Sequence, residues 1–211
     1  MLANLFLDHV LDEWFERDVM PRMKGRCVLI RYCDDFVSGC EREQDARRIL
    51  AVLPKRFARF TLTIHPQKTR LVRFQPPRGR HAGERGDGTF DFLGLTHDWA
   101  KSRRGSWVIK RRTAKTRLWR AMRAVWHWCR AHRHAPIWVQ YRALCQKLRG
   151  HYQYYGIRGN YRKLEARYRR VERAWRYWVS RRGGPRTIRW ETFATRCAVL
   201  PLPTPRIMHN I

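Results

Sequence analysis

Residues 27–38 have the sequence CVLIRYCDDFVS, in which an apolar, β-favouring run meets two adjacent carboxylates, Asp34 and Asp35. A nearly continuous apolar run is typical of a strand covered on both faces, so we expect strands at Cys27–Cys33 and Phe36–Cys40, joined by a carboxylate turn. Two ionised carboxylates beside a core are costly unless a cation neutralises them. Carboxylate oxygens suit Mg²⁺, so the pair is a candidate metal site. An ordinary turn is the competing interpretation, because Asp favours turns through local hydrogen bonds.

The charge of the chain predicts a polyanionic partner. The 211 residues are 44% hydrophobic, which is enough for the chain to fold. They carry a formal net charge of +29, which favours a polyanion such as nucleic acid as the partner. The charge is uneven: residues 1–45 hold ten of the 17 acidic residues, whereas residues 101–211 hold 29 Lys and Arg against three Glu. The second part therefore looks suited to lie against phosphates.

The cysteines and the apolar runs indicate the compartment. Six cysteines, at positions 27, 33, 40, 129, 145 and 197, form no C-x-x-C pair. This pattern fits neither a zinc site nor a secreted disulfide framework, and we expect reduced thiols in the cytoplasm. No apolar run reaches the roughly 18 residues that a membrane span needs, so we expect no membrane association.

Periodicity divides the chain into an α/β unit to about residue 98 and a helical unit after about residue 110. We expect helices at Leu2–Val19, Glu43–Arg59, Ala114–Arg130, Ile137–Tyr155 and Trp190–Val199, and one that follows Asn160 as its N-cap. Further strands are expected at Thr61–Ile64, Arg70–Phe74, Thr89–Leu95 and Trp107–Lys110, with a loop at residues 75–88. In the helix from Ala114, the spacing puts Trp119, Met122, Trp126 and Cys129 on one face.

Five segments along the chain together resemble one family of proteins. YCDD at residues 32–35 resembles the Y-x-D-D box of reverse transcriptases. The other four are LANLFL (2–7), LTIHPQKT (62–69), FDFLGL (90–95) and LRGHYQYYGI (148–157). In this order the segments resemble those of the group II intron-encoded reverse transcriptase/maturase family, and the last of them resembles its maturase, or domain X, signature. The resemblance implies an α+β fold: residues 1–98 as the C-terminal part of a polymerase palm, an antiparallel sheet with helices, and residues 110–211 as an all-α basic thumb.

The resemblance also implies roles for individual residues. Asp34 and Asp35 would be catalytic residues that hold two Mg²⁺ ions for nucleotidyl transfer from a dNTP. Asp34 would lie nearer to the metal ions than Asp35. Lys68 would be a general acid for pyrophosphate, or a solvated lysine at a strand end. The residues implied at the primer and template are Tyr32, Cys33, Phe92, Leu93 and Gly94. Phe92–Gly94 also fits an ordinary buried strand with a bulge.

The basic helical unit would bind structured intron RNA and the RNA/DNA primer-template. Arg favours bidentate phosphate contacts, and Arg dominates here. The candidate RNA-binding residues are Arg111, Arg112, Lys115, Arg162, Lys163, Arg167 and Arg170. The aromatic stripe that includes Tyr161, Trp175 and Trp178 favours core packing over base stacking. A metal cluster at His127, His132 and His134 is disfavoured, since no Cys or carboxylate lies at ligand spacing.

One departure from the family bears on activity. Such polymerases hold their metals with a further aspartate from an earlier palm strand, and the acidic residues before Asp34 lie on or just after the opening helix. We therefore expect the fingers and first half of the palm on an upstream fragment, and no polymerisation by this chain alone. The alternatives are a non-catalytic RNA-binding maturase remnant and a generic basic protein, which the ordered motifs disfavour.

Overall fold

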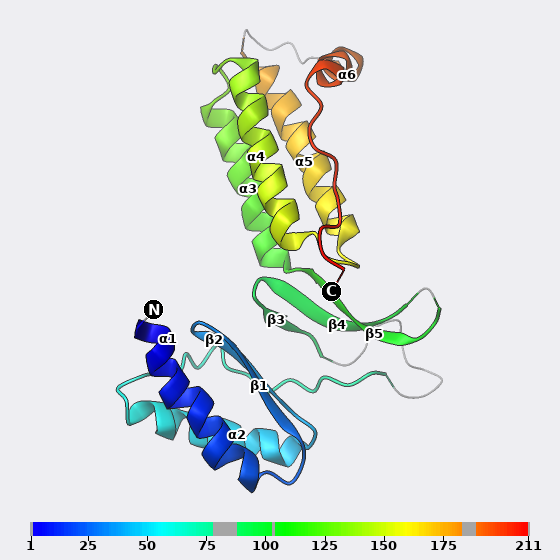
Figure 1. The fold of residues 1–211 in the computed structure, drawn as a ribbon. Coiled ribbons are helices and arrows are strands. Elements are labelled where there is room, and N and C mark those ends of the chain that lie inside the picture. Colours follow the sequence, from blue (N-terminus) through cyan, green and yellow to red (C-terminus); the bar gives the residue numbers. More distant parts are fainter. Residues whose placement is uncertain (1, 78–87, 103, 183–188, 211) are drawn as a thin grey trace.

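The computed structural model describes residues 2–77, 88–102, 104–182 and 189–210, and has mixed α+β architecture, as predicted (Figure 1). The helices are α1 (Leu2–Leu7), η1 (Asp8–Glu13), η2 (Phe15–Val19), η3 (Met20–Arg22), α2 (Glu43–Ala58), α3 (Lys115–Ala131), α4 (Ile137–Tyr155), α5 (Tyr161–Val179) and α6 (Trp190–Val199). The strands are β1 (Cys27–Tyr32), β2 (Asp35–Cys40), β3 (Phe90–Phe92), β4 (Leu95–Lys101) and β5 (Trp107–Thr113).

The opening helix is continuous but changes its winding. It begins as an α-helix and continues through two wider π-type segments, η1 and η2, into η3. Val10, Leu11 and Phe15 are at most 1% exposed, and they pack in the same cores as Leu53 and Ile49 of α2. The predicted helix at Leu2–Val19 is confirmed, and its packing against α2 supports the first hairpin.

The first hairpin, β1–β2, is a two-stranded antiparallel sheet in which Cys27 pairs with Cys40 and Tyr32 with Asp35. The prediction that β1 is covered on both faces was wrong. Burial alternates along the strand, with Val28 and Ile30 50% and 55% exposed. Successive side chains of a strand point to opposite faces, and the helices cover only one of them. Asp34 and Asp35 are accordingly exposed. The expectation that they lie beside a core was therefore wrong.

Three other strand predictions need correction. Residues 61–64 and 70–74 form no strand: Thr61 and Leu62 donate backbone hydrogen bonds back to the end of α2, and Leu62 and Ile64 pack on the core without a pairing strand. The predicted strand at Thr89–Leu95 is β3, a tight turn at Leu93–Gly94 and the start of β4. The turn forms because both of its residues have positive φ, 51° and 73°. Most of the loop expected at residues 75–88 lies outside the described residues.

The second sheet, β3–β4–β5, joins directly to the helical bundle, which stands above it in Figure 1. Thr113 ends β5, and the Ala114 amide at the start of α3 donates 2.9 Å to the Gly94 carbonyl. Within this sheet the carboxylate of Asp98, 1% exposed, pairs with Arg112. This short connection places the start of α3 beside the β3–β4 turn.

Figure 1 shows α3, α4, α5 and α6 as a helical bundle. These four helices share one cluster of buried apolar residues. The buried face of α3 is Leu118, Val125 and Cys129, so the face predicted for this helix was wrong at Trp119, which is 62% exposed. On α5, Leu164, Val171 and Trp175 are at most 3% exposed. At Trp175 this confirms the prediction that the aromatic stripe packs in the core.

Asn160 precedes α5, as predicted, but its side chain does not cap the helix. Its Oδ1 accepts 2.9 Å from the Thr113 amide, and its Nδ2 donates 2.8 Å to both Thr113 Oγ1 and the Tyr155 carbonyl. Asn160 thus ties β5 and the end of α4 to the start of α5.

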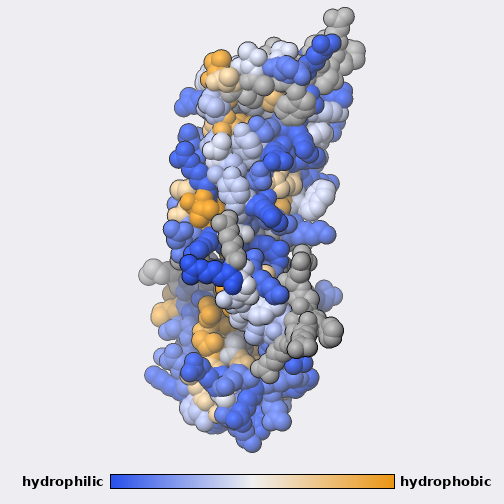
Figure 2. Space-filling model, turned by 90° about the vertical axis from the view of Figure 1, so that its right-hand side faces the viewer, coloured by the Kyte–Doolittle hydropathy of each residue, from blue (hydrophilic) through white to orange (hydrophobic). Residues whose placement is uncertain are grey.

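The surface in Figure 2 is largely hydrophilic, with separate apolar patches. Among the described residues, we find no helix with both the length and the apolar character of a membrane span.

Candidate active-site cleft

A cleft of about 470 Å³ lies where the two hairpin turns and the helical bundle meet. The residues that line it are Tyr32, Cys33, Asp34, Asp35, Leu93, Gly94, Arg117, Tyr154 and Tyr155. Six of these are site residues predicted from the sequence. They come from two separate hairpins, and the fold brings them together.

The β1–β2 turn presents the carboxylates. Tyr32 and Asp35 pair as the last rung of the hairpin, and Cys33 has φ 54°, in the left-handed region. This conformation costs a non-glycine residue about 1–2 kcal/mol, and strain of this kind is common at functional sites. The turn places the two adjacent carboxylates among the residues that line the cleft.

Arg31 links this turn to the opening helix. Its guanidinium bonds both carboxylate oxygens of Asp12 on η1, at 2.6 to 2.9 Å, and its Nη1 donates 3.0 Å to the Cys33 carbonyl. The hydrogen bond to Asp12 raises the pKa of Arg31, which stays charged. The opening helix thereby holds the backbone of the carboxylate turn.

The β3–β4 turn contributes Leu93 and Gly94 to the wall of the cleft. Its backbone is held by the Tyr154 hydroxyl, which donates 2.9 Å to the Leu93 carbonyl, and by the Ala114 amide on the Gly94 carbonyl. A Cβ on Gly94 would lie 2.9 Å from Tyr155 Oη, so Tyr155 packs closely against this glycine. Burial raises the pKa of the half-buried Tyr155, which is therefore neutral and can donate a hydrogen bond.

Three lining residues come from the helical bundle. Arg117 on α3 places a cation in a cleft that holds two carboxylates, which suits a phosphate-bearing ligand held together with a metal ion. Arg117 was not predicted from the sequence, because it is one of many arginines. Tyr154 and Tyr155 were predicted only as part of the family segment at residues 148–157. The short β5–α3 connection was the signal that could have located Arg117.

The carboxylate pair fits Mg²⁺ in its chemistry. Mg²⁺ commonly takes one or two carboxylates and keeps several waters, and both Asp34 and Asp35 are exposed to solvent in the cleft. Within the described ranges, no group of three or more His, Cys, Asp or Glu side chains could hold a metal. The pair thus supplies two carboxylates of a possible magnesium site.

Two predicted site residues do not line the cleft. Lys68 lies in a turn that is outside the lining of the cleft. In this turn the amides of Lys68 and Thr69 each donate a 3.1 Å hydrogen bond to the His65 carbonyl. Phe92 pairs with Leu95 at the base of the β3–β4 turn. Its backbone shapes the turn, whereas the lining residues are Leu93 and Gly94.

The predicted RNA-binding residues divide by exposure. Lys115, Arg162 and Arg170 are exposed, whereas Arg111 and Lys163 are half-buried. Arg167 is 6% exposed on the inner face of α5, where burial lowers its pKa, so its assignment to the RNA-facing surface was wrong. The position of an arginine in the helical repeat, and not its residue type, decides whether it faces the solvent or the core. Arg112 is half-buried and its charge is neutralised by Asp98, which weakens its candidacy.

Comparison with known proteins gives one match. Residues 1–97 match the family model of reverse transcriptase (RNA-dependent DNA polymerase). No curated protein and no solved structure matches the chain. The matched range contains both turns of the cleft, so this part of the chain is similar to a reverse transcriptase domain.

Proposed function

We propose that the chain is part of a group II intron-encoded reverse transcriptase/maturase, with residues 1–98 in the palm and residues 110–211 as the thumb, or domain X. The observation that supports this proposal best is the cleft, which is lined by both the Asp34–Asp35 turn and the Leu93–Gly94 turn. Both turns lie within residues 1–97, which match the reverse transcriptase model. In this proposal the cleft binds Mg²⁺, the primer end and a dNTP, and the basic helices bind intron RNA during splicing.

In the proposed chemistry, bound Mg²⁺ would activate the primer hydroxyl and neutralise charge on the transferred phosphate. Asp34 and Asp35 would hold the ion, and Arg117 would bind a phosphate oxygen. Leu93 and Gly94, which line the cleft, would contact the primer end.

A second polypeptide segment is part of the proposal. The outer face of β1 exposes Val28, Ile30 and Tyr32 by 50%, 55% and 63%. These residues alternate along a strand, as they would if a further layer of palm covered them. An upstream fragment with the fingers and another metal-binding aspartate would supply that layer.

Primer extension tests the polymerase part. The 211-residue chain alone is expected to extend no primer on an RNA template with Mg²⁺ and dNTPs. Adding the polypeptide encoded immediately upstream should give extension, abolished by Asp34→Ala and retained by the exposed control Glu16→Ala. Extension by the chain alone, lost on Asp34→Ala, would contradict the two-fragment proposal. No extension in any combination would favour the alternative, a non-catalytic RNA-binding maturase remnant.

Salt dependence tests the RNA-binding part. Affinity for structured intron RNA should fall steeply between about 50 and 200 mM salt, by about 10³-fold or more if six or more phosphates are contacted. Arg162→Glu/Arg170→Glu on α5 should reduce both affinity and salt slope, whereas Arg17→Glu on η2 should change them little. A flat salt dependence would contradict RNA backbone recognition.

A further inference from the structure

A second concavity, of about 650 Å³, lies between the opening helix and α2 and shares no residue with the cleft. We call it the α2 groove. The opening helix and the residues just after it contribute Trp14, Asp18, Val19, Arg22 and Met23; α2 and the residue after it contribute Arg48, Val52, Lys55, Arg56 and Arg59. Neither hairpin turn contributes to it.

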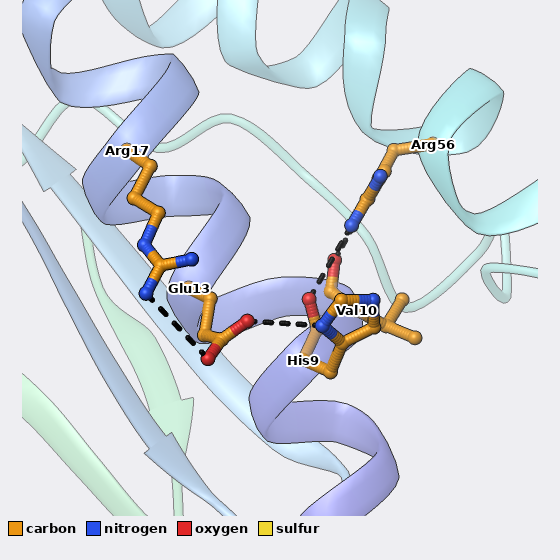
Figure 3. A network of polar contacts seen from close by, with 5 residues as sticks. All are labelled: His9, Val10, Glu13, Arg17 and Arg56. Atoms are coloured by element: carbon orange, nitrogen blue, oxygen red, sulfur yellow. Dashed lines mark hydrogen bonds and ion pairs between the residues drawn. The ribbon is translucent and has the colours of Figure 1, made fainter.

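Arg56, one of the lining residues, links α2 to the opening helix. Figure 3 shows its side chain reaching from α2 to the opening helix, where Nε donates 3.0 Å to the Val10 carbonyl and Nη2 donates 3.3 Å to the His9 carbonyl. Its guanidinium carbon also lies 4.6 Å from the ring centroid of Phe60 and 5.7 Å from that of Trp14. The groove is therefore already formed without a ligand, and Arg56 is a structural part of it.

The cations at the rim exceed the carboxylates. Asp18 is the one carboxylate among the ten lining residues, and it lies 3.8 Å from Arg22. Arg48 lies 3.9 Å from the buried Asp45. Lys55 and Arg59 are exposed, and within the described part of the chain neither has an ion pair.

The floor of the groove is apolar. It consists of Trp14, Val19, Met23 and Val52, and Val52 is 40% exposed. Nucleic acid would use the basic rim but leave the aliphatic floor uncovered. Base stacking would need a free aromatic face, and Arg56 already lies over Trp14. An apolar floor between basic rims instead matches the helix-in-groove mode of protein recognition.

The spacing along α2 suits a helical ligand. Arg48, Val52, Lys55 and Arg59 follow one another at intervals of four, three and four residues, so they share one face of α2 and of the residue with helical φ and ψ that caps it. Eleven residues of helix extend about 16 Å, which is the length of three turns of a partner helix.

We propose that the α2 groove docks an amphipathic helix of a partner protein. The apolar side of that helix would cover Trp14 and Val52, and acidic residues beside it would pair with Lys55 and Arg59. The proposal is independent of the polymerase cleft, because the groove and the cleft share no lining residue.

The test uses the full 211-residue chain and three synthetic 18-residue peptides, measured by fluorescence anisotropy at 150 mM salt. One peptide is an amphipathic helix with Leu on one face and Glu beside it, the second is its scrambled version, and the third has Lys in place of Glu. We expect the first to bind at least tenfold more tightly than the others. Bound peptide should slow hydrogen exchange in residues 14–23 and 48–59.

Variants localise the binding. Lys55→Glu/Arg59→Glu and, separately, Val52→Asp should each weaken the first peptide at least tenfold. The matched control is Arg17→Glu/Arg47→Glu, which changes two exposed arginines on the same helices outside the groove, with side chains 78% and 68% exposed. Circular dichroism checks that each variant is folded.

Three results would overturn the proposal: equal binding of the scrambled peptide, protection outside the groove, or equal weakening by the control pair. A 20-nucleotide single-stranded RNA that bound in the peptide's place, with the same dependence on Lys55 and Arg59, would reassign the groove to nucleic acid.

Discussion

The hydroxyl of Tyr154 donates a 2.9 Å hydrogen bond to the Leu93 carbonyl, across 61 residues of sequence. This bond joins the last turn of α4 to the β3–β4 turn, which lines the same cleft as Asp34 and Asp35. The helical bundle therefore holds one wall of the cleft, and its effect can be measured by removing single groups.

Removing only the Tyr154 hydroxyl should loosen that wall. Tyr154→Phe keeps the ring and is expected to lower the free energy of unfolding by about 0.5–1 kcal/mol, since the bond is partly exposed. Hydrogen exchange at the amides of residues 93–96 should accelerate more than elsewhere. Tyr161→Phe, another exposed tyrosine, is the control. Unchanged exchange at the turn would show that Tyr154 does not position it.

Adding a Cβ at Gly94 should be more harmful than adding one at Gly105. Both have positive φ, 73° and 82°, so Ala costs about 1 kcal/mol of backbone strain at either position. At Gly94 the Cβ would also lie 2.9 Å from Tyr155 Oη, whereas nothing lies within 4 Å at Gly105. We expect urea unfolding to show an additional loss of about 1–2 kcal/mol for Gly94→Ala. Equal losses would mean that Tyr155 moves aside freely.

Asn160 should be a strong determinant of bundle stability. Asn160→Asp preserves shape but replaces two donors with an oxygen that faces Thr113 Oγ1 and the Tyr155 carbonyl. In a site where Asn160 is 1% exposed, we expect a loss of about 3 kcal/mol in thermal or urea unfolding at pH 7. The exposed control Asn4→Asp should change stability by less than about 0.5 kcal/mol. A comparable small effect at Asn160 would contradict its role as the tie between β5, α4 and α5.

His151 should make the protein less stable in mild acid. Burial, with a contribution from the charge of Arg167, lowers the pKa of His151 from 6.5 to about 3. Above pH 6.5 the ring is neutral in both states, so it adds no pH dependence. Between pH 6.5 and 3 the proton binds to the unfolded chain and not to the folded one. The free energy of unfolding therefore decreases as the pH is lowered, by about 2 kcal/mol at about pH 5 relative to pH above 6.5.

The His151 contribution is isolated by comparing pH profiles. His151→Phe keeps a ring against Tyr155, whose centroid lies 4.6 Å from that of His151, and removes the proton-binding site. Urea unfolding between pH 8 and 5 should show a shallower decline for the variant than for the parent chain. Parallel profiles would mean that His151 is protonated inside the fold.

Local sequence predicted most helices well. Ile137–Tyr155 and Trp190–Val199 have the predicted bounds, because long apolar periodicity and the nearby Pro and Gly residues act within a few residues of chain. The same local signals failed where pairing decides the outcome. Residues 61–64 and 70–74 have strand-like side chains but no partner strand, and β-structure needs hydrogen bonds from a distant segment.

The site divides in the same way. The sequence by itself determined which side chains could do chemistry: the Asp34–Asp35 pair, the Leu93–Gly94 turn and an excess of arginine. Only the tertiary structure decided that the two turns meet at one cleft with Arg117 and Tyr154, that Arg167 is interior, and that both carboxylates are exposed. The physical reason is that residue chemistry is local, whereas burial and proximity depend on contacts between segments that are far apart in the chain.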